Sequence, residues 1–355
     1  MTTAIYTLTH KDFEAPKNPI YHPLSVFCDK GDNIAGKNCY YSELTGCYWA
    51  YKNAPEDILG IAHYRRYLIN ERGTLLSESE IQKTLNEYDM LTPKILTLNF
   101  PYEYGFSKNH KPYYLEELSK LLMEKYPEVY PVYSNLIKGV NTLFGNMLIA
   151  RRSLFIDYHE WLFSILFDLE NRIEIDEPDS YHRRIFGFIS EFLLYVYVKL
   201  RGLRIKEHMV GMVGEKTEVR TLKRELWDLL SRGDFMGAKA HFLDARNARP
   251  DILMEASDIG WELHYLMEAI AILEHERDEG IHPFIEKIGS YEELIAYLRN
   301  LNSITREHFR QSPGKDLNYW ALAETKGKAF ENYSAEAIRI AATLVEAETQ
   351  IAKNN

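Results

Sequence analysis

The chain has 355 residues, a formal net charge of −10 at pH 7, and 25 Tyr, 16 Phe and 5 Trp. This length is sufficient for two domains with a large core, and the aromatic excess suits both cores and sugar-stacking surfaces. The negative charge argues against a general nucleic-acid-binding protein, which needs a basic face, so any anion site must be local.

The first half of the chain alternates short apolar runs with amphipathic segments. The apolar runs predict strands over residues 4–9, 25–28, 58–62, 88–92, 146–150 and 205–209. The amphipathic segments predict helices over residues 41–53, 77–87, 115–126, 131–139, 152–172 and 185–200. Ser77 and Glu80 fit a capping box. Residues 99–114 have no clear period, and we expect a long loop there. This alternation predicts an α/β fold with helices on both faces of a parallel or mixed sheet.

The composition changes near Glu218, beyond which the chain is rich in Ala, Leu and Glu. Helices are predicted over residues 218–231, 234–246, 250–277, 291–311 and 334–352. We therefore expect an α/β domain over residues 1–215 and an all-helical domain over residues 216–355. The helical domain carries no chemistry that we can identify from its sequence.

Cysteine usage and hydropathy restrict the cellular setting. Cys28, Cys39 and Cys47 match no zinc-binding pattern and leave one thiol unpaired, as expected for reduced cysteines in a cytoplasmic protein. The chain has no basic and apolar leader at its start and no apolar run near 18 residues. We expect a cytoplasmic protein, at most peripheral at the inner face of the membrane.

The segment from residue 57 to 67 is the most informative in the chain. Its apolar strand ends abruptly in His63, Arg65 and Arg66. Ligands of α/β sheets gather beyond the carboxyl ends of strands, and guanidinium groups fit phosphate oxygens in shape and charge. The segment predicts an anion site, with solvated or surface-paired arginines as the alternative. We predict no metal, because no Asp-X-Asp follows any of the strands and adjacent positive charge opposes a cation.

A Gly-rich polar loop over residues 29–38 is a second candidate. Asp32, Asn33 and Lys37 lie in it beside two glycines whose backbone could approach a ligand closely. The loop lacks the Gly-Lys-Ser/Thr ending of nucleotide-kinase phosphate loops. The alternative is a plain polar turn that ends in a helix cap at Asn38.

Two further polar residues stand at positions suited to substrate contact. Asn146 precedes a predicted strand, where its amide could bond a sugar hydroxyl. Glu191 lies in a helix that follows the basic segment 182–184, where a carboxylate could act as a general base. The alternative for Glu191 is a pairing with the helix dipole, Arg183 or Arg184.

Taken together, these stretches resemble a bacterial family first defined as a domain of unknown function and found in capsule, exopolysaccharide and O-antigen loci. The resemblance spans about residues 4–210 and rests on seven separated motifs in the expected order. These motifs lie at residues 9–11, 31–38, 43–53, 60–67, 145–147, 158–166 and 184–191. Members of the family look like glycosyltransferases of the GT-A architecture, and one branch comprises galactofuranosyltransferases.

The resemblance implies a GT-A-like mixed, mainly parallel sheet flanked by helices, with a C-terminal helical appendage. It implies inverting, metal-independent transfer of galactofuranose from UDP-galactofuranose to a glycan acceptor. Glu191 would deprotonate the acceptor, with Glu43 or Glu160 as the next candidates. His63, Arg65 and Arg66 would stabilise the departing diphosphate.

The remaining site residues follow from the same resemblance. The implied donor-binding residues are Thr7, Thr9, His10, Lys11, Asp32, Asn33, Lys37 and Asn146. Trp161 and Arg184 are implied as acceptor or sugar contacts, with the core as the alternative place for Trp161.

The implied partners are a nucleotide-sugar donor and a lipid-linked oligosaccharide acceptor, with no nucleic acid and no cofactor. The helical tail could hold the acceptor at the membrane face or mediate self-association. Two alternatives stay open: transfer from a UDP-pyranose (galactose or glucose), and a non-catalytic nucleotide-sugar-binding protein.

Overall fold

A computed structural model describes residues 1–177, 179–253, 257–311 and 328–354 of the chain. The chain divides into two compact units, Met1–Val213 and Gly214–Asn355. We call them the sheet unit and the helical unit.

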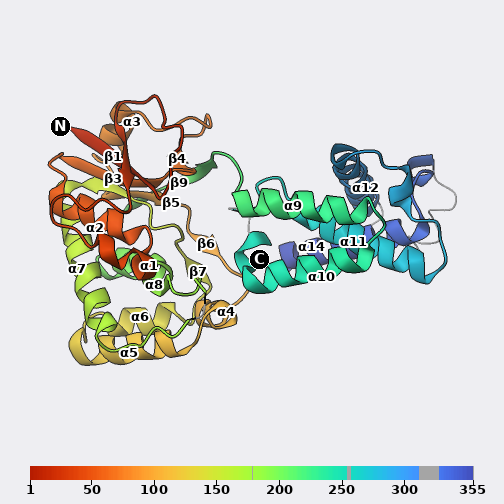
Figure 1. Cartoon of the computed structure of the whole chain (residues 1–355). Helices are drawn as coiled ribbons and strands as arrows, with labels where there is room; N and C mark the ends of the chain where they lie inside the picture. Colours follow the sequence, from red (N-terminus) through yellow and green to blue (C-terminus); the bar gives the residue numbers. More distant parts are fainter. Residues whose placement is uncertain (178, 254–256, 312–327, 355) are drawn as a thin grey trace. The chain divides into compact units, whose positions relative to one another are not determined.

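A seven-stranded mixed sheet forms the centre of the sheet unit (Figure 1). Its strands are β1 (Thr3–Thr9), β2 (Tyr21–Ser25), β3 (Ile58–His63), β4 (Arg66–Ile69), β5 (Met90–Pro93), β8 (Ile149–Arg151) and β9 (Ile205–Met212). β1 pairs in parallel with β2 and β3, and β5 pairs in parallel with β9. β8 runs antiparallel to both β3 and β5, and β4 runs antiparallel to β3 and β9. The α/β class predicted from the sequence is confirmed, with a mixed sheet.

Helices flank this sheet, and a two-stranded antiparallel sheet is separate from it. The helices are α1 (Asn38–Tyr41), α2 (Leu44–Asn53), α3 (Glu78–Thr84), α4 (Tyr102–Asn109), α5 (Tyr113–Lys125), α6 (Tyr130–Leu136), α7 (Arg152–Glu170) and α8 (Ile185–Leu200). The small sheet consists of β6 (Leu96–Thr97) and β7 (Asn141–Thr142), with α4, α5 and α6 between them in the chain. The predicted capping box is present at α3, where Ser77 and Glu80 bond each other's backbone.

Both faces of the central strands are buried, which explains their continuous apolar sequences. Leu59 and Ile61 of β3 belong to the core shared with α1, α2, α5, α6, α7 and α8. Ile58 and Ala62 belong to the core shared with α3. Because side chains alternate along a strand, His63 continues the face of Leu59 and Ile61. The strand therefore delivers its imidazole toward the larger group of helices.

Two predicted elements are wrong in position. The second strand spans Tyr21–Ser25 instead of residues 25–28. This strand contains Pro23, which it tolerates because β2 is an edge strand. The predicted helix over residues 41–53 is interrupted at Ser42, whose φ of 50° separates α1 from α2.

The predicted loop over residues 99–114 is also wrong, because α4 occupies most of it and α5 begins at Tyr113. Tyr102 and Phe106 of α4 are buried at helical spacing. Frequent glycine, asparagine and proline residues masked this short period in the sequence.

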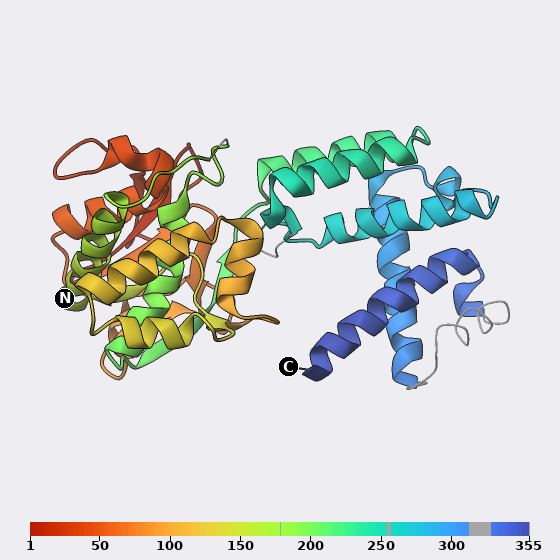
Figure 2. The same cartoon turned by 90° about the horizontal axis from the view of Figure 1, so that it is seen from below.

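The helical unit has its own core. Its long helices are α9 (Thr217–Leu230), α10 (Phe235–Ala248), α11 (Glu262–Asp278), α12 (Tyr291–Gln311) and α14 (Ala335–Asn354), and α12 and α14 cross (Figure 2). Lys223 of α9 is buried and pairs with Glu215, Asp258 and Glu262 at 2.5, 2.9 and 3.0 Å. This network ties α9 to the start of α11. None of the helices in the described residues has the length and apolar character needed to span a bilayer.

Candidate active site

A left-handed turn at Gly145 and Asn146 is the centre of the candidate site. The two residues have φ of 95° and 49° and lie shortly before β8. His63 Nε2 donates a hydrogen bond to the carbonyl of Gly145, whose N–H donates to Glu191 Oε1 at 2.9 Å. Asn146 Nδ2 donates to Glu43 Oε1 at 2.8 Å. Three side chains from β3, α8 and the start of α2 thus converge on one turn.

Three hydrogen bonds within the protein engage the amide of Asn146. Its Nδ2 also donates to the carbonyl of Gly187 at 3.1 Å, and its Oδ1 accepts from Ser190 Oγ at 2.8 Å. Only 5% of the residue is exposed. Asn146 therefore fastens α8 to the turn, with both amide hydrogens used inside the protein and only one lone pair of Oδ1 left for the sugar hydroxyl that we expected it to bind.

The two carboxyl groups on the turn have opposite protonation preferences. Burial, reinforced by repulsion from Glu43, raises the pKa of Glu191 to about 8, against the opposing effect of Arg66. Burial also opposes the charge on Glu43, but His63 and the hydrogen bond from Asn146 outweigh it and hold the pKa of Glu43 below its ordinary value. Paired carboxyls whose pKa values are pushed apart are typical of acid–base sites.

Burial favours the neutral form of the His63 imidazole. It lowers the pKa of His63 below the ordinary value; Glu43 opposes this shift, and Arg66 and Arg65 add to it. Because Nε2 donates to a carbonyl, Nε2 carries a proton. Of the three positive groups that we expected, the two guanidinium groups are therefore the permanent charges.

Two arginines approach the turn from opposite elements. Arg66 pairs with His63 in the β3–β4 register, and its Nη1 lies 3.5 Å from the place that a Cβ on Gly145 would occupy. Arg184 stands at the start of α8 with its guanidinium over the rings of Tyr181 and Phe188, at 4.9 and 5.6 Å. Both guanidinium groups favour the charged form of Glu191.

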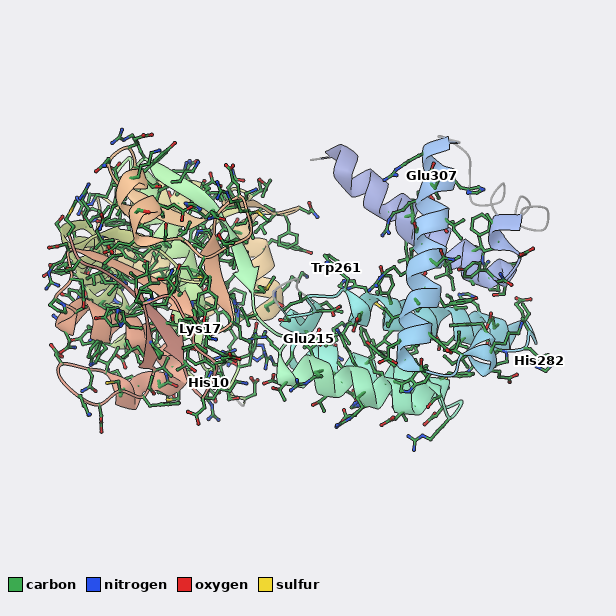
Figure 3. All side chains as sticks on the ribbon, turned by 90° about the horizontal axis from the view of Figure 1, so that it is seen from above. His10, Lys17, Glu215, Trp261, His282 and Glu307 are labelled. Atoms are coloured by element: carbon green, nitrogen blue, oxygen red, sulfur yellow. The ribbon has the colours of Figure 1, made fainter. Side chains whose placement is uncertain are left out.

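A second cationic cluster surrounds the ring of Tyr64, just beyond β3. Lys11 Nζ lies 5.3 Å and Arg65 Cζ 5.6 Å from the ring centroid, and the His10 ring meets it edge-on at 5.3 Å (Figure 3 labels His10). Arg65 Nη1 is buried without a hydrogen-bond partner in the described part of the chain. Guanidinium donors are rarely left unpaired, so this cluster is suited to an anion.

Two further predicted donor-binding residues, Thr7 and Thr9, belong to β1. Thr7 is completely buried, and its Oγ1 has no hydrogen-bond partner in the described part of the chain. Thr9 Oγ1 accepts from the N–H of Lys11 at 3.1 Å. This bond stabilises the end of β1 from which His10 and Lys11 follow.

The Gly-rich loop is held mainly by its own residues and α2. Asn33 Nδ2 donates to the carbonyl of Gly31 at 2.9 Å, and Asn53 bonds both the N–H and the carbonyl of Asp32. Lys37 forms an ion pair of 2.6 Å with Glu170 at the end of α7. The charge of Lys37 is thus compensated within the fold, whereas the side chain of Asp32 is exposed.

Trp161 lies in the core between α7 and α8. Its ring packs against Tyr197 at 5.1 Å and Tyr158 at 6.4 Å between centroids. The structure therefore favours the core alternative for this residue over the sugar contact.

Tyr102 of α4 and His110, which follows α4, lie against α8, the helix of Glu191. We did not single out either residue from the sequence. Tyr102 stacks on Phe192 at 4.1 Å, and burial followed by the charge of Glu191 raises the pKa of Tyr102. His110 packs on Phe188 at 4.3 Å, and burial lowers its pKa to about 3. The signal for them was the spacing of four between Tyr102, Phe106 and His110.

Comparison with known proteins places the chain in a family. The family model described as a domain of unknown function, DUF4422, matches residues 4–202. The chain belongs to the DUF4422 family. All residues that hold the Gly145–Asn146 turn lie inside the DUF4422 region.

Within the residues that the structure describes, no group of three or more His, Cys, Asp or Glu side chains could hold a metal ion.

A solved structure is similar to part of this chain. The apo structure of WbbM, a bifunctional glycosyltransferase, matches with a TM-score of 0.55 and 27% sequence identity. The match covers 61% of this chain and 46% of WbbM, so this DUF4422 chain spans less than half the length of that protein. No curated protein sequence matches the chain.

The first prediction concerns the pH dependence of stability. With a pKa of about 8 in the folded protein and about 4.3 when unfolded, Glu191 binds a proton in the folded state that the unfolded state has lost. The wild type therefore loses stability as the pH rises through this interval, and Glu191→Gln does not. We expect Glu191→Gln to raise Tm by at least about 2 °C relative to the wild type near pH 8, and by less near pH 5.

Glu160→Gln is the matched control, because Glu160 is an exposed carboxylate on α7. Its Tm difference from the wild type should be small at both pH values. A Glu191→Gln difference that does not change with pH would contradict the raised pKa.

Proposed function

We propose that this protein is a glycosyltransferase of surface-polysaccharide synthesis with a GT-A-like sheet unit, which transfers galactofuranose from UDP-galactofuranose to a glycan acceptor carried on a lipid. One observation carries the proposal: an uncharged and a charged carboxyl share a turn beside guanidinium groups at the carboxyl end of β3. The similarity to a bifunctional glycosyltransferase and the family membership support it.

The donor diphosphate binds to the positive groups beyond β1 and β3. Arg65 Nη1, which has no partner in the described residues, and Arg66 provide fixed donors for the phosphoryl oxygens. His10 and Lys11 add hydrogen-bond donors for the nucleotide part of UDP. In this proposal Thr9, Asp32 and Asn33 contact the same part of the donor. Fixed cationic donors neutralise the charge that develops on the leaving group, as a metal ion does in other enzymes. The proposed reaction is accordingly metal-independent.

Glu191 is the general base of the proposed reaction. In its charged form it takes the proton of the acceptor hydroxyl while that oxygen forms a bond to the anomeric carbon. The bond from this carbon to the phosphate oxygen breaks, and UDP leaves with the electron pair, so the anomeric configuration inverts. A carboxyl with a pKa of about 8 is a stronger base than an ordinary glutamate once it is charged.

The neighbours of Glu191 position it and set its basicity. Glu43 stays charged and raises the pKa of Glu191 by repulsion. His63 and Asn146 hold the turn to which Glu191 is bonded. Arg184 lies on the acceptor side, at the start of the same helix.

The second prediction separates the two carboxyls by kinetics. Glu191→Gln should lower turnover of UDP-galactofuranose by about 10²-fold or more with nearly unchanged UDP affinity, because only the base is lost. The wild-type kcat/KM should rise with pH through a limb near 8, because the base must lose its proton. In Glu43→Gln this limb should move to lower pH, because the repulsion that raises the pKa of Glu191 is gone. The rates of hydrolysis and of transfer should be measured for both variants with a panel of UDP-sugars that includes pyranose forms. The same panel tests which donor sugar the protein uses.

Glu160, the other candidate base from the sequence, is exposed on α7 and is not among the residues that hold the turn. Glu160→Gln therefore serves again as the control, and it should keep the wild-type rate and the wild-type rise of kcat/KM near pH 8. If Glu43→Gln abolishes turnover while Glu191→Gln retains it, the base is Glu43 and the assignment is wrong.

The third prediction concerns the diphosphate. Arg65→Ala should weaken UDP binding by about 10- to 100-fold and lower turnover, because a charge-assisted hydrogen bond contributes about 1.5–3 kcal/mol. Arg72→Ala removes an equal charge from the exposed turn after β4 and should leave UDP affinity unchanged. Titration calorimetry with UDP would decide, and an Arg65→Ala affinity equal to that of the wild type would exclude this phosphate site.

A further inference from the structure

Exposed apolar side chains gather along the segment from β6 into α4 and at the residue before β7. Leu96, Phe100, Tyr104 and Val140 are 45%, 41%, 51% and 37% exposed. The first three recur every four residues along one continuous segment. We call these four residues the α4 patch.

The backbone and the rings make this patch continuous. The N–H of Leu98 donates to the carbonyl of Val140 at 2.7 Å. This bond extends the β6–β7 pairing and holds Val140 beside the segment that leads into α4 (Figure 1). The Phe100 and Tyr104 rings lie 5.9 Å apart. A Cβ on Gly105 would lie only 2.3 Å from the Phe100 ring, so the glycine makes room for this ring on the helix.

Lysines border the patch. Lys94, Lys108 and Lys138 are exposed and form no ion pair in the part of the chain that the structure describes. Lys108 Nζ lies 4.9 Å from the centroid of the Tyr104 ring. The exposed acids beside the patch are Glu103 on α4 and Glu207, whose carboxylate accepts a hydrogen bond from the N–H of Ile95 at 2.8 Å. The three lysines outnumber these two carboxylates in a chain whose net charge is −10.

We infer that the α4 patch docks on a lipid bilayer that contains anionic lipids. Leucine and aromatic side chains bordered by lysines are typical of surfaces that lie in the membrane interface. The lysines complement anionic headgroups, each contributing about 1 kcal/mol near such a surface. A protein partner fits less well, because lysine is depleted from protein interfaces.

The α4 patch lies close to the helix that carries Glu191, so docking through it would place the candidate site near the membrane. Tyr102, on the other side of α4 from Tyr104, and His110, which follows α4, pack on Phe192 and Phe188 of α8, the helix of Glu191. Helix α4 thus lies between Tyr104 of the patch and the helix that carries the proposed base. Docking through α4 would bring a lipid-carried acceptor to the site, and this clause alone rests on the proposed function. It assigns membrane contact to the sheet unit in place of the helical tail that the sequence led us to expect.

The fourth prediction tests the docking with the full chain and vesicles of phosphatidylcholine with and without phosphatidylglycerol. The wild type should co-sediment with the anionic vesicles, and more weakly at high salt. Lys94→Glu combined with Lys108→Glu should weaken this binding by about tenfold or more, because two favourable charges become unfavourable. Leu96→Ser combined with Tyr104→Ser should weaken it as well, through lost apolar contact.

Two controls match these variants. Lys83→Glu reverses an exposed charge on α3, and Met123→Ser removes a 54% exposed apolar side chain from α5. Both should bind vesicles as the wild type does. UDP affinity should be unchanged in all variants, which separates a failure of docking from a failure of the proposed activity. The inference would be overturned if the wild type does not co-sediment with anionic vesicles. It would also be overturned if the patch variants bind these vesicles as strongly as the controls do.

Discussion

The structure of the candidate site depends on the hydrogen bonds that hold the left-handed Gly145–Asn146 turn. Glu43, His63 and Glu191 come from segments far apart in the chain, and each bonds an atom of this turn. Buried polar groups are costly unless they are paired, so these bonds fix the side chains relative to one another. A site built this way is preorganised, because its groups need no rearrangement before a substrate arrives.

The close packing of Glu43, His63 and Glu191 around the turn also determines which of these groups is charged. Burial opposes ionisation of Glu191, and repulsion from Glu43 adds to this effect, so the pKa of Glu191 is raised to about 8 while that of Glu43 stays below its ordinary value. Burial also favours the neutral form of His63, which leaves Arg65 and Arg66 as the permanent positive charges. In an acidic chain, these guanidinium groups are the proposed local anion site. The proposed division of labour follows: guanidinium groups hold the leaving group, and the weakly acidic carboxyl receives the proton.

How much of this could be predicted from the sequence depends on the range of the interactions. The apolar runs and helical periods located β1, β3 and α8, and the abrupt polar end of β3 singled out His63 and its neighbours. These are local signals. The hydrogen bond of Asn146 with Glu43 and the ion pair of Lys37 with Glu170 join residues more than 100 positions apart, and no local pattern predicts them. The protonation order of the carboxyls also depends on such contacts. The helix α4 was missed because its period is short and interrupted by turn-forming residues.

The central claim is that the guanidinium groups beyond β3 bind the donor diphosphate in the place of a metal ion. A crystal structure of the full chain with UDP, grown in the presence of manganese and measured for anomalous scattering, tests it most directly. The account predicts phosphoryl oxygens within hydrogen-bond distance of Arg65 and Arg66, with no manganese peak between the phosphates. A diphosphate bound away from these side chains, or a manganese ion that bridges its two phosphoryl groups, would contradict it.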